Sequence, residues 1–511
     1  MGLIILLYLI LSSFIILFFN YSSILVSQHH GSHWLLGYGN QNDSSLYGRS
    51  LLKFTNDSLL ITRNSGGSKF DLGFNNNSFS DEKGNLKIFY DGFRLGNAVD
   101  FNIIENGDTL NPGKIWNQFQ GALYPIHVAS FFLPPLDNDS LVLLFHLPLE
   151  FYTHIPYLYS PHIYLTITNI FANNGKGKVK SKNNIIFSGN ISPLVFSSCR
   201  HSNGRDWWIV TKNNQSSTYY KLLVINNEFV RIDSQEIGIS ENDFATIGNA
   251  VFSQNGKKLA RISHKDEIQI FDFDRCDGKL SNFIQIKNDS IGPSLWVNIA
   301  ISPNDRYLYA STNTKIFQYD LEASDIGSSM EIVGKWDGYI YDRYFSTSFC
   351  DMQLAPDGKI YISCASGNIF LHVINNPNKK GASCNFRLRD VTLPTYIACG
   401  LGNYPNYLLG RELGTICDSL TSIIDHETRY FFEIYPNPTD GRLYLANQFR
   451  DFSEALHFTI SNLSGEIVAF MELPTSKNTW EYDFSFLNPG VYFIQLYKNH
   501  RLVQSGKLLM H

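Results

Sequence analysis

Apolar and polar residues alternate in short runs along most of this chain, and turn-forming residues separate the runs. Such alternation over four to eight residues is typical of strands with one buried face. The clearest runs occur in three similar segments that begin at Val251, Ala300 and Gln353, 49 and 53 residues apart. Each segment has an apolar run, a turn, a second run, a short loop and a third run. The pattern predicts repeated antiparallel β-structure with a period of about 50 residues.

Each repeat has turn residues that suit a tight hairpin between its first two runs. Asn255-Gly256 and Asp357-Gly358 adopt positive φ at low cost. Pro303 and Pro356 preset φ just before the turn. A unit of this size holds about four strands, and it cannot bury both of its faces without neighbours.

Weaker copies of the repeat extend toward the N-terminus, at residues 80–92 and 201–210, with apolar runs at 141–147 and 163–167 between them. Four-stranded sheets that stack radially form a β-propeller. Residues 31–418 have room for about seven such blades. The sequence therefore predicts an all-β fold whose main domain is a propeller of about seven blades.

The last eighty or so residues have shorter alternating runs and a different set of turns. Pro436 and Pro438 each fix φ and remove a backbone donor, so they cannot lie in a central strand. Turns are expected at 439–441 and 488–490. About five to seven short strands over this length predict a small immunoglobulin-like antiparallel sandwich at residues 431–511, after a short linker at 419–430.

From about Phe431 to His511 the chain resembles the type A C-terminal sorting domain of the type IX secretion system of Bacteroidetes. The resemblance rests on a Y-P-N-P-x-x-G motif, an Asn-Leu-Ser-Gly turn, an L-x-P-G-V-Y-F-I motif and a terminal Lys-Leu-Leu. Their key residues here are Pro436, Asn437, Pro438, Gly441, Gly465, Pro489, Gly490, Tyr492 and Lys507. An ordinary accessory immunoglobulin-like module is the alternative interpretation.

The resemblance implies a destination and partners. A protein of this class crosses to the periplasm, and the type IX translocon then recognises its sorting domain. A sortase-like peptidase removes that domain, here near residues 419–431, and can join the new end to a surface lipopolysaccharide. We therefore expect a protein that is secreted or displayed on the outer cell surface.

The repeats also resemble the propeller region of Bacteroidetes surface proteins that carry this sorting domain. The resemblance rests on residues 84–92 (G-N-L-K-I-F-Y-D-G), 201–208 (H-S-N-G-R-D-W-W) and 399–404 (C-G-L-G-N-Y). In the last motif Gly402 stands where the family often has proline. We expect 399–404 to take part in closing the ring.

The N-terminus is consistent with export. Residues 3–19 are apolar except for Ser12 and Ser13, and the first basic residue is Arg49. A secretory signal normally has a basic start and a shorter apolar core, so a retained inner-membrane helix is the alternative. We favour a signal peptide at residues 1–27, because a protein tethered in the inner membrane could not follow an outer-membrane sorting signal.

Composition narrows the function classes. The net charge of −5 and the pI near 6.3 give no indication of nucleic-acid binding. The seven cysteines include no C-x-x-C pair, and an odd number in an exported protein leaves at least one unpaired. Cys384, Cys399 and Cys417 are close enough in sequence to suggest one late disulfide. We expect buried free thiols for most of the others.

Motifs for chemistry are scarce. The chain has no G-x-S-x-G, H-E-x-x-H or P-loop pattern, and we expect no cofactor and no metal. Asp272, Asp274 and Asp277 are weak candidates for calcium, since oxygen ligands at this spacing suit that ion. A strand end that runs into a hairpin is the plainer interpretation.

Two clusters are candidates for ligand binding. His201, Arg205, Asp206 and Trp207 combine polar groups with an aromatic wall, although such a group also serves to fix the corner of a blade. Trp336, Tyr341 and Tyr344 lie in an aromatic stretch that connects two blades, where they suit a recognition surface. A core strand of the next blade is the alternative for that stretch.

We therefore expect an exported protein whose propeller binds a glycan, a protein or an envelope component. A propeller hydrolase or lyase remains the alternative, because catalytic residues of propellers are scattered over several blades. Carboxylates and histidines around a closed pocket in the channel would favour an enzyme. An aromatic, hydrogen-bonding surface would favour binding, and a purely structural role in adhesion or gliding is the third class.

Overall fold

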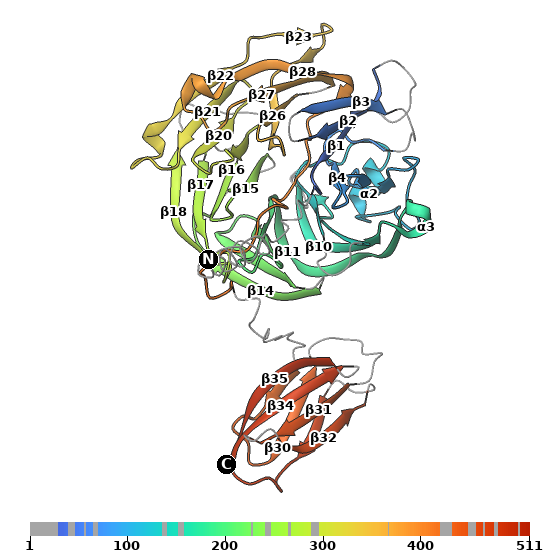
Figure 1. The fold of residues 1–511 in the computed structure, drawn as a ribbon, viewed down its shortest axis with the longest axis vertical. Coiled ribbons are helices and arrows are strands. Elements are labelled where there is room, and N and C mark those ends of the chain that lie inside the picture. Colours follow the sequence, from blue (N-terminus) through green and yellow to red (C-terminus); the bar gives the residue numbers. More distant parts are fainter. Residues whose placement is uncertain are drawn as a thin grey trace, which may run out of the picture. The chain divides into compact units, whose positions relative to one another are not determined.

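The computed structural model describes residues 29–38, 46–55, 58–64, 70–134, 140–151, 158–225, 228–240, 247–263, 267–287, 296–365, 367–418, 432–447, 456–462, 466–474, 479–498 and 501–511 (Figure 1). The chain divides into two compact units, one of residues 1–227 and 233–411 and one of residues 228–232 and 412–511. The signal peptide expected at 1–27 and the linker expected at 419–430 lie outside the described residues. Within the described ranges, no helix has the length and apolar character needed to span a membrane.

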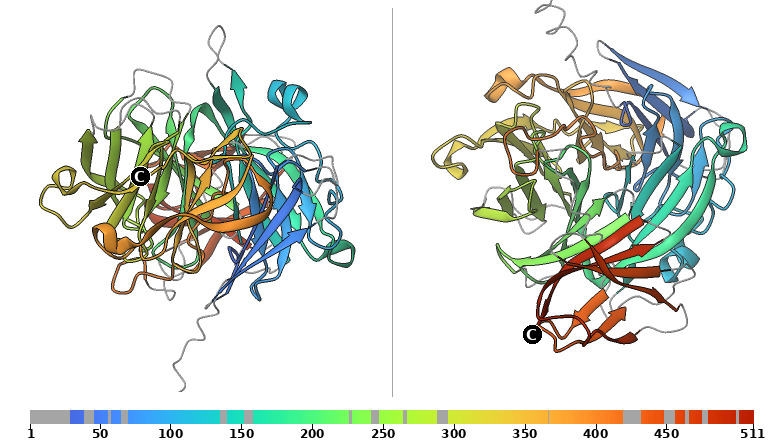
Figure 2. Two further views of the ribbon diagram at one scale, coloured as in Figure 1. Left: turned by 90° about the horizontal axis from the view of Figure 1, so that it is seen from above. Right: turned by 60° about the horizontal axis from the view of Figure 1, so that its bottom comes forward.

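The first unit is a β-propeller whose sheets stand around a central channel (Figures 1 and 2). Its first two blades have three strands each: β1 (His33–Tyr38), β2 (Gly48–Phe54) and β3 (Leu59–Asn64), then β4 (Asn77–Ser80), β5 (Leu86–Tyr90) and β6 (Leu95–Asn97). Its last three blades have four strands each: β15 (Gly248–Phe252), β16 (Lys258–Ser263), β17 (Glu267–Phe273) and β18 (Leu280–Lys287); β19 (Asn298–Ile301), β20 (Tyr307–Ser311), β21 (Lys315–Asp320) and β22 (Glu331–Lys335); β25 (Phe349–Leu354), β26 (Ile360–Cys364), β27 (Asn368–Ile374) and β28 (Phe386–Ile397).

One eight-stranded sheet supplies the two middle blades. Its strands are β7 (Ser130–Leu133), β8 (Leu141–His146), β9 (Glu150–Phe151), β10 (Leu158–Asn169), β11 (Lys178–Arg200), β12 (Trp207–Asn213), β13 (Thr218–Ile225) and β14 (Glu228–Glu236). Residues 178–191 of β11 pair with β10, and residues 191–200 pair with β12. The eight-stranded sheet counts as two blades, because its long strand β11 belongs to both. Together with the five other propeller sheets it gives a ring of seven blades, which confirms the predicted fold.

Short elements connect the blades. They are α2 (Lys114–Phe119), α3 (Ala172–Gly175), two 3₁₀ turns (Gly327–Ser329 and Gly381–Cys384) and a small hairpin of β23 (Ile340–Tyr341) and β24 (Phe345–Ser346). The turns expected at Asn255-Gly256, after Pro303 and at Asp357-Gly358 join β15 to β16, β19 to β20 and β25 to β26. Gly256 and Gly358 have φ of 72° and 77°, as a tight hairpin requires.

Amide and carboxylate side chains connect the first strands of neighbouring blades around the channel. Asn249 exchanges two hydrogen bonds with the backbone of Ile299, at 3.1 and 2.9 Å. Asn298 Nδ2 donates to Asp351 Oδ1 at 2.6 Å. These side chains satisfy polar groups that the ring buries at its centre.

Residues 399–407, which we call the channel segment, run through the middle of the ring after β28 (Figure 1). Asn403 donates its backbone N–H to Asn77 Oδ1 at 2.8 Å and its side-chain amide to the carbonyl of Phe196 at 2.9 Å. Leu401 N donates to Asp351 Oδ2 at 2.9 Å. One segment thus joins the second, fourth and seventh blades, and it closes the ring without forming a strand.

A disulfide holds the start of the channel segment. Cys399 is bonded to Cys350 in β25, with 5.6 Å between their Cα atoms. The expectation of a disulfide within the group Cys384, Cys399 and Cys417 was wrong, because the segment folds back against the first strand of the last blade and Cys384 is a buried thiol. Cys276 and Cys417 are also disulfide-bonded, whereas Cys199 and Cys364 are buried thiols outside any disulfide.

Three buried histidines in the propeller are held neutral. Burial lowers the pKa of His146 to about 3, and it lowers the pKa values of His33 and His372 to about 4. The imidazole of His146 lies 2.6 Å from Asn111 Oδ1 and 2.9 Å from Thr166 Oγ1. A charged imidazole at this site would lack solvation, so protonation favours the unfolded chain.

These histidines predict loss of stability in acid. Their folded pKa values lie below the unfolded value near 6.5, so their contribution is complete above about pH 6.5 and is lost as the pH falls toward 4. Asp91 has the opposite effect on the free energy of unfolding. Burial raises its pKa to about 7, so the stability that it contributes is present below about pH 4 and is lost as the pH rises from 4 to 7. We expect the free energy of unfolding to fall between pH 6.5 and 4, and His146→Gln to reduce that slope by about 1.4 kcal/mol per pH unit. Urea unfolding at several pH values measures it, and an unchanged slope in the variant would refute the assignment.

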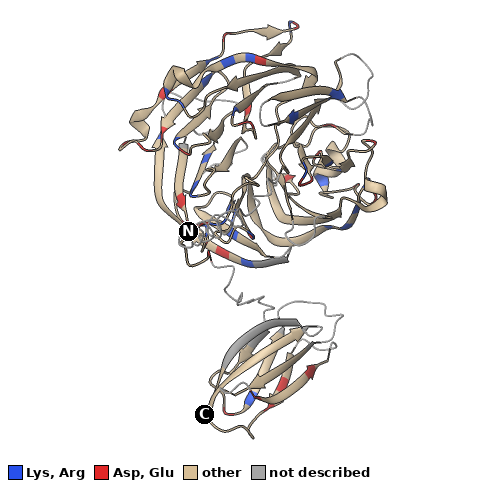
Figure 3. Ribbon diagram, in the orientation of Figure 1, with Lys and Arg blue, Asp and Glu red and all other residues tan. Residues whose placement is uncertain are grey.

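The second unit contains a sandwich of two antiparallel sheets. One sheet has the order β29-β30-β33 and the other β32-β31-β34-β35. The strands are β29 (Phe432–Tyr435), β30 (Arg442–Asn447), β31 (Leu456–Ser461), β32 (Ile467–Leu473), β33 (Thr479–Asp483), β34 (Gly490–Lys498) and β35 (Arg501–Met510). Leu443, Phe458, Trp480 and Ile494 belong to its own apolar core. Acidic and basic residues are interspersed over both units (Figure 3).

Candidate functional site

The structure places the first predicted cluster at a turn between β11 and β12. His201 Nε2 lies 2.9 Å from the carbonyl of Cys276, and Asn203 N donates to His201 Nδ1 at 3.1 Å. Arg205 pairs with Asp206 at 3.0 Å, and Asn203 also donates to Asp206 at 2.7 Å. Burial lowers the pKa of His201, which favours its neutral form. These contacts fix a blade corner, and a ligand role for His201, Arg205 and Asp206 stays a prediction.

Trp207 of the same cluster is buried. The guanidinium of Arg200 lies 4.4 Å from its ring centroid, a cation–π distance. Its ring also contacts Tyr407 of the channel segment edge-on, with centroids 6.2 Å apart. Trp207 therefore packs inside the propeller, between the corner and the channel.

The second predicted cluster forms the β23–β24 hairpin and the stretch before it. Trp336 is half-buried and donates from Nε1 to Thr347 Oγ1 at 3.1 Å. Tyr341 packs edge-on against Phe370 with centroids 5.3 Å apart. Tyr344 is 81% exposed at the turn of the hairpin. Tyr341 and Tyr344 lie in this hairpin and Trp336 lies just before it, and recognition by these residues stays a prediction.

The three candidate calcium ligands do not converge. Asp272 accepts hydrogen bonds from Lys258 at 2.7 Å and from Asn282 at 2.7 Å. Asp274 accepts from the backbone N–H of Cys276 at 2.7 Å, which is a turn contact. Across the described ranges, no group of three or more His, Cys, Asp or Glu side chains could hold a metal ion.

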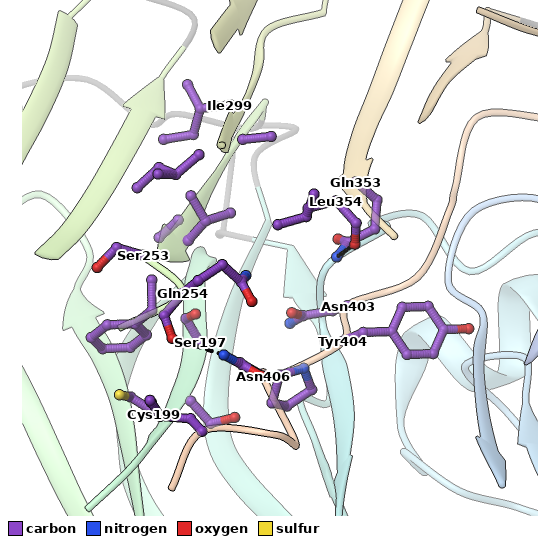
Figure 4. A pocket seen from close by; sticks show the side chains of 18 of the residues that line it. Ser197, Cys199, Ser253, Gln254, Ile299, Gln353, Leu354, Asn403, Tyr404 and Asn406 are labelled. Atoms are coloured by element: carbon purple, nitrogen blue, oxygen red, sulfur yellow. Dashed lines mark hydrogen bonds between the residues drawn. The ribbon is translucent and has the colours of Figure 1, made fainter. Parts of the chain in front are cut away.

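A narrow cavity of about 60 Å³ lies in the central channel, beside the channel segment. Figure 4 shows four amide side chains that line it from three different parts of the chain: Gln254, Gln353, and Asn403 with Asn406. Asn406 Nδ2 donates to the carbonyl of Gln254 at 2.8 Å, which holds the segment against the turn after β15. The channel is thus largely filled by this segment rather than open from end to end.

A larger cavity of about 260 Å³ adjoins it at the mouth of the channel. Both cavities share Gln254, Gln353 and Tyr404 as lining residues. We call the larger one the mouth cavity. It is lined by His29, Gly31, Ser32, Trp34, Phe54, Thr55, Gln254, Pro303, Gln353, Leu354, Ala355, Pro356, Gly358, Tyr404, Pro405, Asn406, Tyr407 and Leu408.

The walls of the mouth cavity are aromatic. Trp34 stacks on Tyr404 with centroids 5.5 Å apart, and Phe54 meets the Trp34 ring edge-on at 4.7 Å. Ser78 N donates to the hydroxyl of Tyr404 at 3.3 Å, and Tyr407 donates its own hydroxyl to the carbonyl of Phe132 at 2.8 Å. Burial raises the pKa values of both tyrosines, so they remain neutral in the physiological range.

Among the described residues that line the cavity there is no Asp, Glu, Lys or Arg. The Trp34 indole N–H has no hydrogen-bond partner in the described structure, but Trp34 is fully buried, so this N–H does not reach the cavity. Gln353 donates from Nε2 to the carbonyl of Leu354 at 3.1 Å, which leaves its carbonyl oxygen for other partners. The mouth cavity therefore combines uncharged walls with hydrogen-bonding groups that a ligand could satisfy.

Sequence reasoning did not find this cavity. Its lining comes from six separate stretches between residues 29 and 408, and each looks like an ordinary turn or strand end. Two signals were visible: the hairpin turns at Pro303 and Pro356, and the 399–404 motif that was expected to help close the ring. Neither signal shows that the turns and the segment meet in space.

The sorting motifs converge at one end of the sandwich. Leu509 N donates to Asn437 Oδ1 at 2.9 Å, and Thr439 N donates to the carbonyl of Leu509 at 2.9 Å. The peptide bonds before Pro436 and Pro438 are cis. Gly490 pairs with Met510 in the β34–β35 ladder, and Lys507 pairs with Phe493. The Y-P-N-P stretch, the P-G turn and the terminal strand are therefore neighbours in space.

Two further motif residues stabilise this arrangement. Gly441 has φ of 114°, and a Cβ there would lie 2.5 Å from Ser485 Cα. Tyr492 is buried and donates its hydroxyl to the carbonyl of Asn488 at 2.9 Å, next to exposed Pro489. Gly465 lies outside the described residues. Gly441 and Tyr492 therefore contribute to the fold of the domain itself.

Comparison with known proteins identifies the tail. Residues 433–511 match the family described as secretion system C-terminal sorting domain. No curated protein matches the chain. The sorting domain directs export through type IX secretion to the cell surface or the extracellular space.

Solved structures similar to this chain include several with low identity. A putative 6-phosphogluconolactonase from Bacteroides uniformis is 14% identical, with 71% of this chain and 97% of that chain covered and a TM-score of 0.42. The periplasmic gluconolactonase of Pseudomonas aeruginosa is 12% identical, with 89% and 100% covered and a TM-score of 0.34. A β-propeller domain from Myceliophteria thermophila is 10% identical, with 66% and 94% covered and a TM-score of 0.35.

Proposed function

We propose that this protein, which carries a secretion sorting domain at residues 433–511, is an exported binding protein whose propeller holds a small ligand at the mouth of its channel. The mouth cavity carries the proposal. It is a concave site with aromatic walls and convergent polar groups, which is the usual composition of a ligand pocket. The channel segment forms its floor, so a ligand would bind at the mouth and would not pass through the ring.

The arrangement supports binding over catalysis. Hydrolysis or elimination at this site would need groups that exchange protons near neutral pH. Among the described lining residues no carboxylate is present, and burial keeps the two tyrosines neutral. A glycan, a protein terminus or an envelope component are the ligand classes in this proposal.

The proposal includes removal of the sorting domain after export. After export, a sortase-like peptidase would remove the sorting domain near residues 419–431. The new end would then be joined to a surface lipopolysaccharide, so the propeller would be displayed on the cell. A role in adhesion would follow from the binding of surface glycans or partner cells.

Filling the mouth cavity tests the proposal. A Cβ at Gly31 would have only ordinary contacts, 3.6 Å from the Tyr407 ring, and the backbone there is unstrained. We expect Gly31→Leu to fold normally and to lose binding of whole cells or envelope fragments at least tenfold. Gly121→Leu is the matched control, because a Cβ at Gly121 meets nothing within 4 Å and that residue lies outside the cavity. Equal binding by both variants in a pull-down with envelope fragments would contradict the site.

A further inference from the structure

We infer that the ligand of the mouth cavity is a neutral carbohydrate, bound through a single sugar ring. This inference rests on the proposed function and names the chemistry of its ligand. It follows from the charge of the lining, from its side-chain amides and from the size of the cavity.

The described lining disfavours charged ligands. It has no Asp, Glu, Lys or Arg, so a carboxylate, phosphate or ammonium group moved from water into this site would lose its solvation without a carboxylate, ammonium or guanidinium group to pair with. Desolvation of an unpaired ion costs several kcal/mol or more. Uncharged ligands avoid that cost, so sugar acids and amino sugars with a free amine are disfavoured.

Polar groups on the lining disfavour a purely apolar ligand. An apolar molecule would bury the side-chain amides of Gln254 and Gln353, which line the cavity, and would give them no new partners. Each polar group that is buried unpaired costs about 1–3 kcal/mol. Hydroxyl groups both donate and accept, so a polyhydroxylated ring satisfies both amides.

Size and shape restrict the ligand further. About 260 Å³ is slightly below the usual range of ligand pockets, which suits one sugar ring rather than an extended chain. The two faces of a pyranose are apolar enough to pack on aromatic walls such as those of Tyr404 and Phe54. The channel segment closes the inner end, so the ring at the end of a glycan would enter and the rest would lie outside.

Calorimetric titration of the full chain tests the inference. The probes are D-glucose, D-galactose, D-mannose and N-acetyl-D-glucosamine, with D-glucuronate, D-glucosamine and cyclohexanol as charged and apolar comparators. We expect at least one neutral sugar to bind at millimolar concentration and the comparators to bind at least tenfold more weakly. Failure of every neutral sugar to bind, or equal binding of a comparator, overturns the inference.

Variants link that binding to the cavity. Gln254→Met and Gln353→Met each keep the length of a half-buried side chain and remove its amide. Each is expected to weaken sugar binding about tenfold, the effect of one lost hydrogen bond to a buried group. Gln120→Met is the matched control, because Gln120 is also half-buried but lies outside the cavity.

The outcomes separate this inference from the proposed function. If a charged or apolar probe binds and Gly31→Leu abolishes that binding, the cavity is a ligand site and only its carbohydrate assignment fails. If a neutral sugar binds equally to wild type, Gly31→Leu, Gln254→Met and Gln353→Met, the sugar site lies elsewhere and both proposals fail. Loss of binding in Gln120→Met as well would show a general effect of these substitutions and would also refute the inference.

Discussion

Removal of residues 433–511 is expected to stop the appearance of this protein outside the cell while the propeller still folds. The sandwich has an apolar core made of its own residues, and the propeller blades have separate cores. Neither core therefore depends on the other for its burial. Fractionation and immunoblotting should find the truncated protein in the periplasm and the full chain at the surface or in the medium.

A single substitution should reproduce that result. At Gly441 the positive φ and the close approach of Ser485 leave no room for a Cβ, so Gly441→Ala is expected to unfold the sandwich and to abolish export. Gly490→Ala is the control, since its Cβ would have only ordinary contacts at 3.7 Å. Export of Gly441→Ala at the normal level would refute the prediction. Loss of export by a folded Gly490→Ala would show that the machinery reads this turn directly.

Mass spectrometry of the exported protein tests the proposed removal of the tail. We expect a new C-terminus within residues 419–431 and no peptides from the sorting domain. Surface protein with an intact C-terminus at His511 would contradict the proposed processing, although it would leave the role of the domain in export unaffected.

Loss of the Cys350–Cys399 disulfide is expected to destabilise the ring by about 4 kcal/mol, from the chain entropy of a loop of 49 residues. The bond joins the first strand of the last blade to the channel segment, so its removal frees the segment that closes the ring. Urea unfolding of Cys350→Ser, Cys399→Ser and the double variant measures the effect by intrinsic fluorescence.

Comparison of the two single variants with the double variant separates the loss of the disulfide from the change of each side chain. Because either substitution breaks the same bond, each single variant should cost about as much as the double variant. Additive costs would show that the two cysteines act independently. Asn403→Ala should add a further loss, about 1–3 kcal/mol, because its side-chain amide and the carbonyl of Phe196 meet at the ring centre.

The repeats and the sorting tail could be predicted because their signals are local. Alternating runs around Asn255-Gly256 and Asp357-Gly358 specify hairpins within a few residues, and the structure has strands on both sides of those turns. The strand β11 could not be predicted, since a continuous strand that serves two blades differs from two shorter strands only in its tertiary pairing. The expected late disulfide failed for the same reason, because the proximity of Cys399 to Cys350 arises from ring closure.

The sequence by itself determined that this protein is a chain of β-sheet repeats with a secretion signal at its end, because hairpin turns, alternation and the tail motifs act over short distances. The tertiary structure alone decided where a ligand could bind. Trp34, Gln254, Gln353 and Tyr404 are far apart along the chain, and each on its own is an ordinary residue of a strand or a turn. They form one uncharged cavity only because seven blades close into a ring and the channel segment returns through its centre.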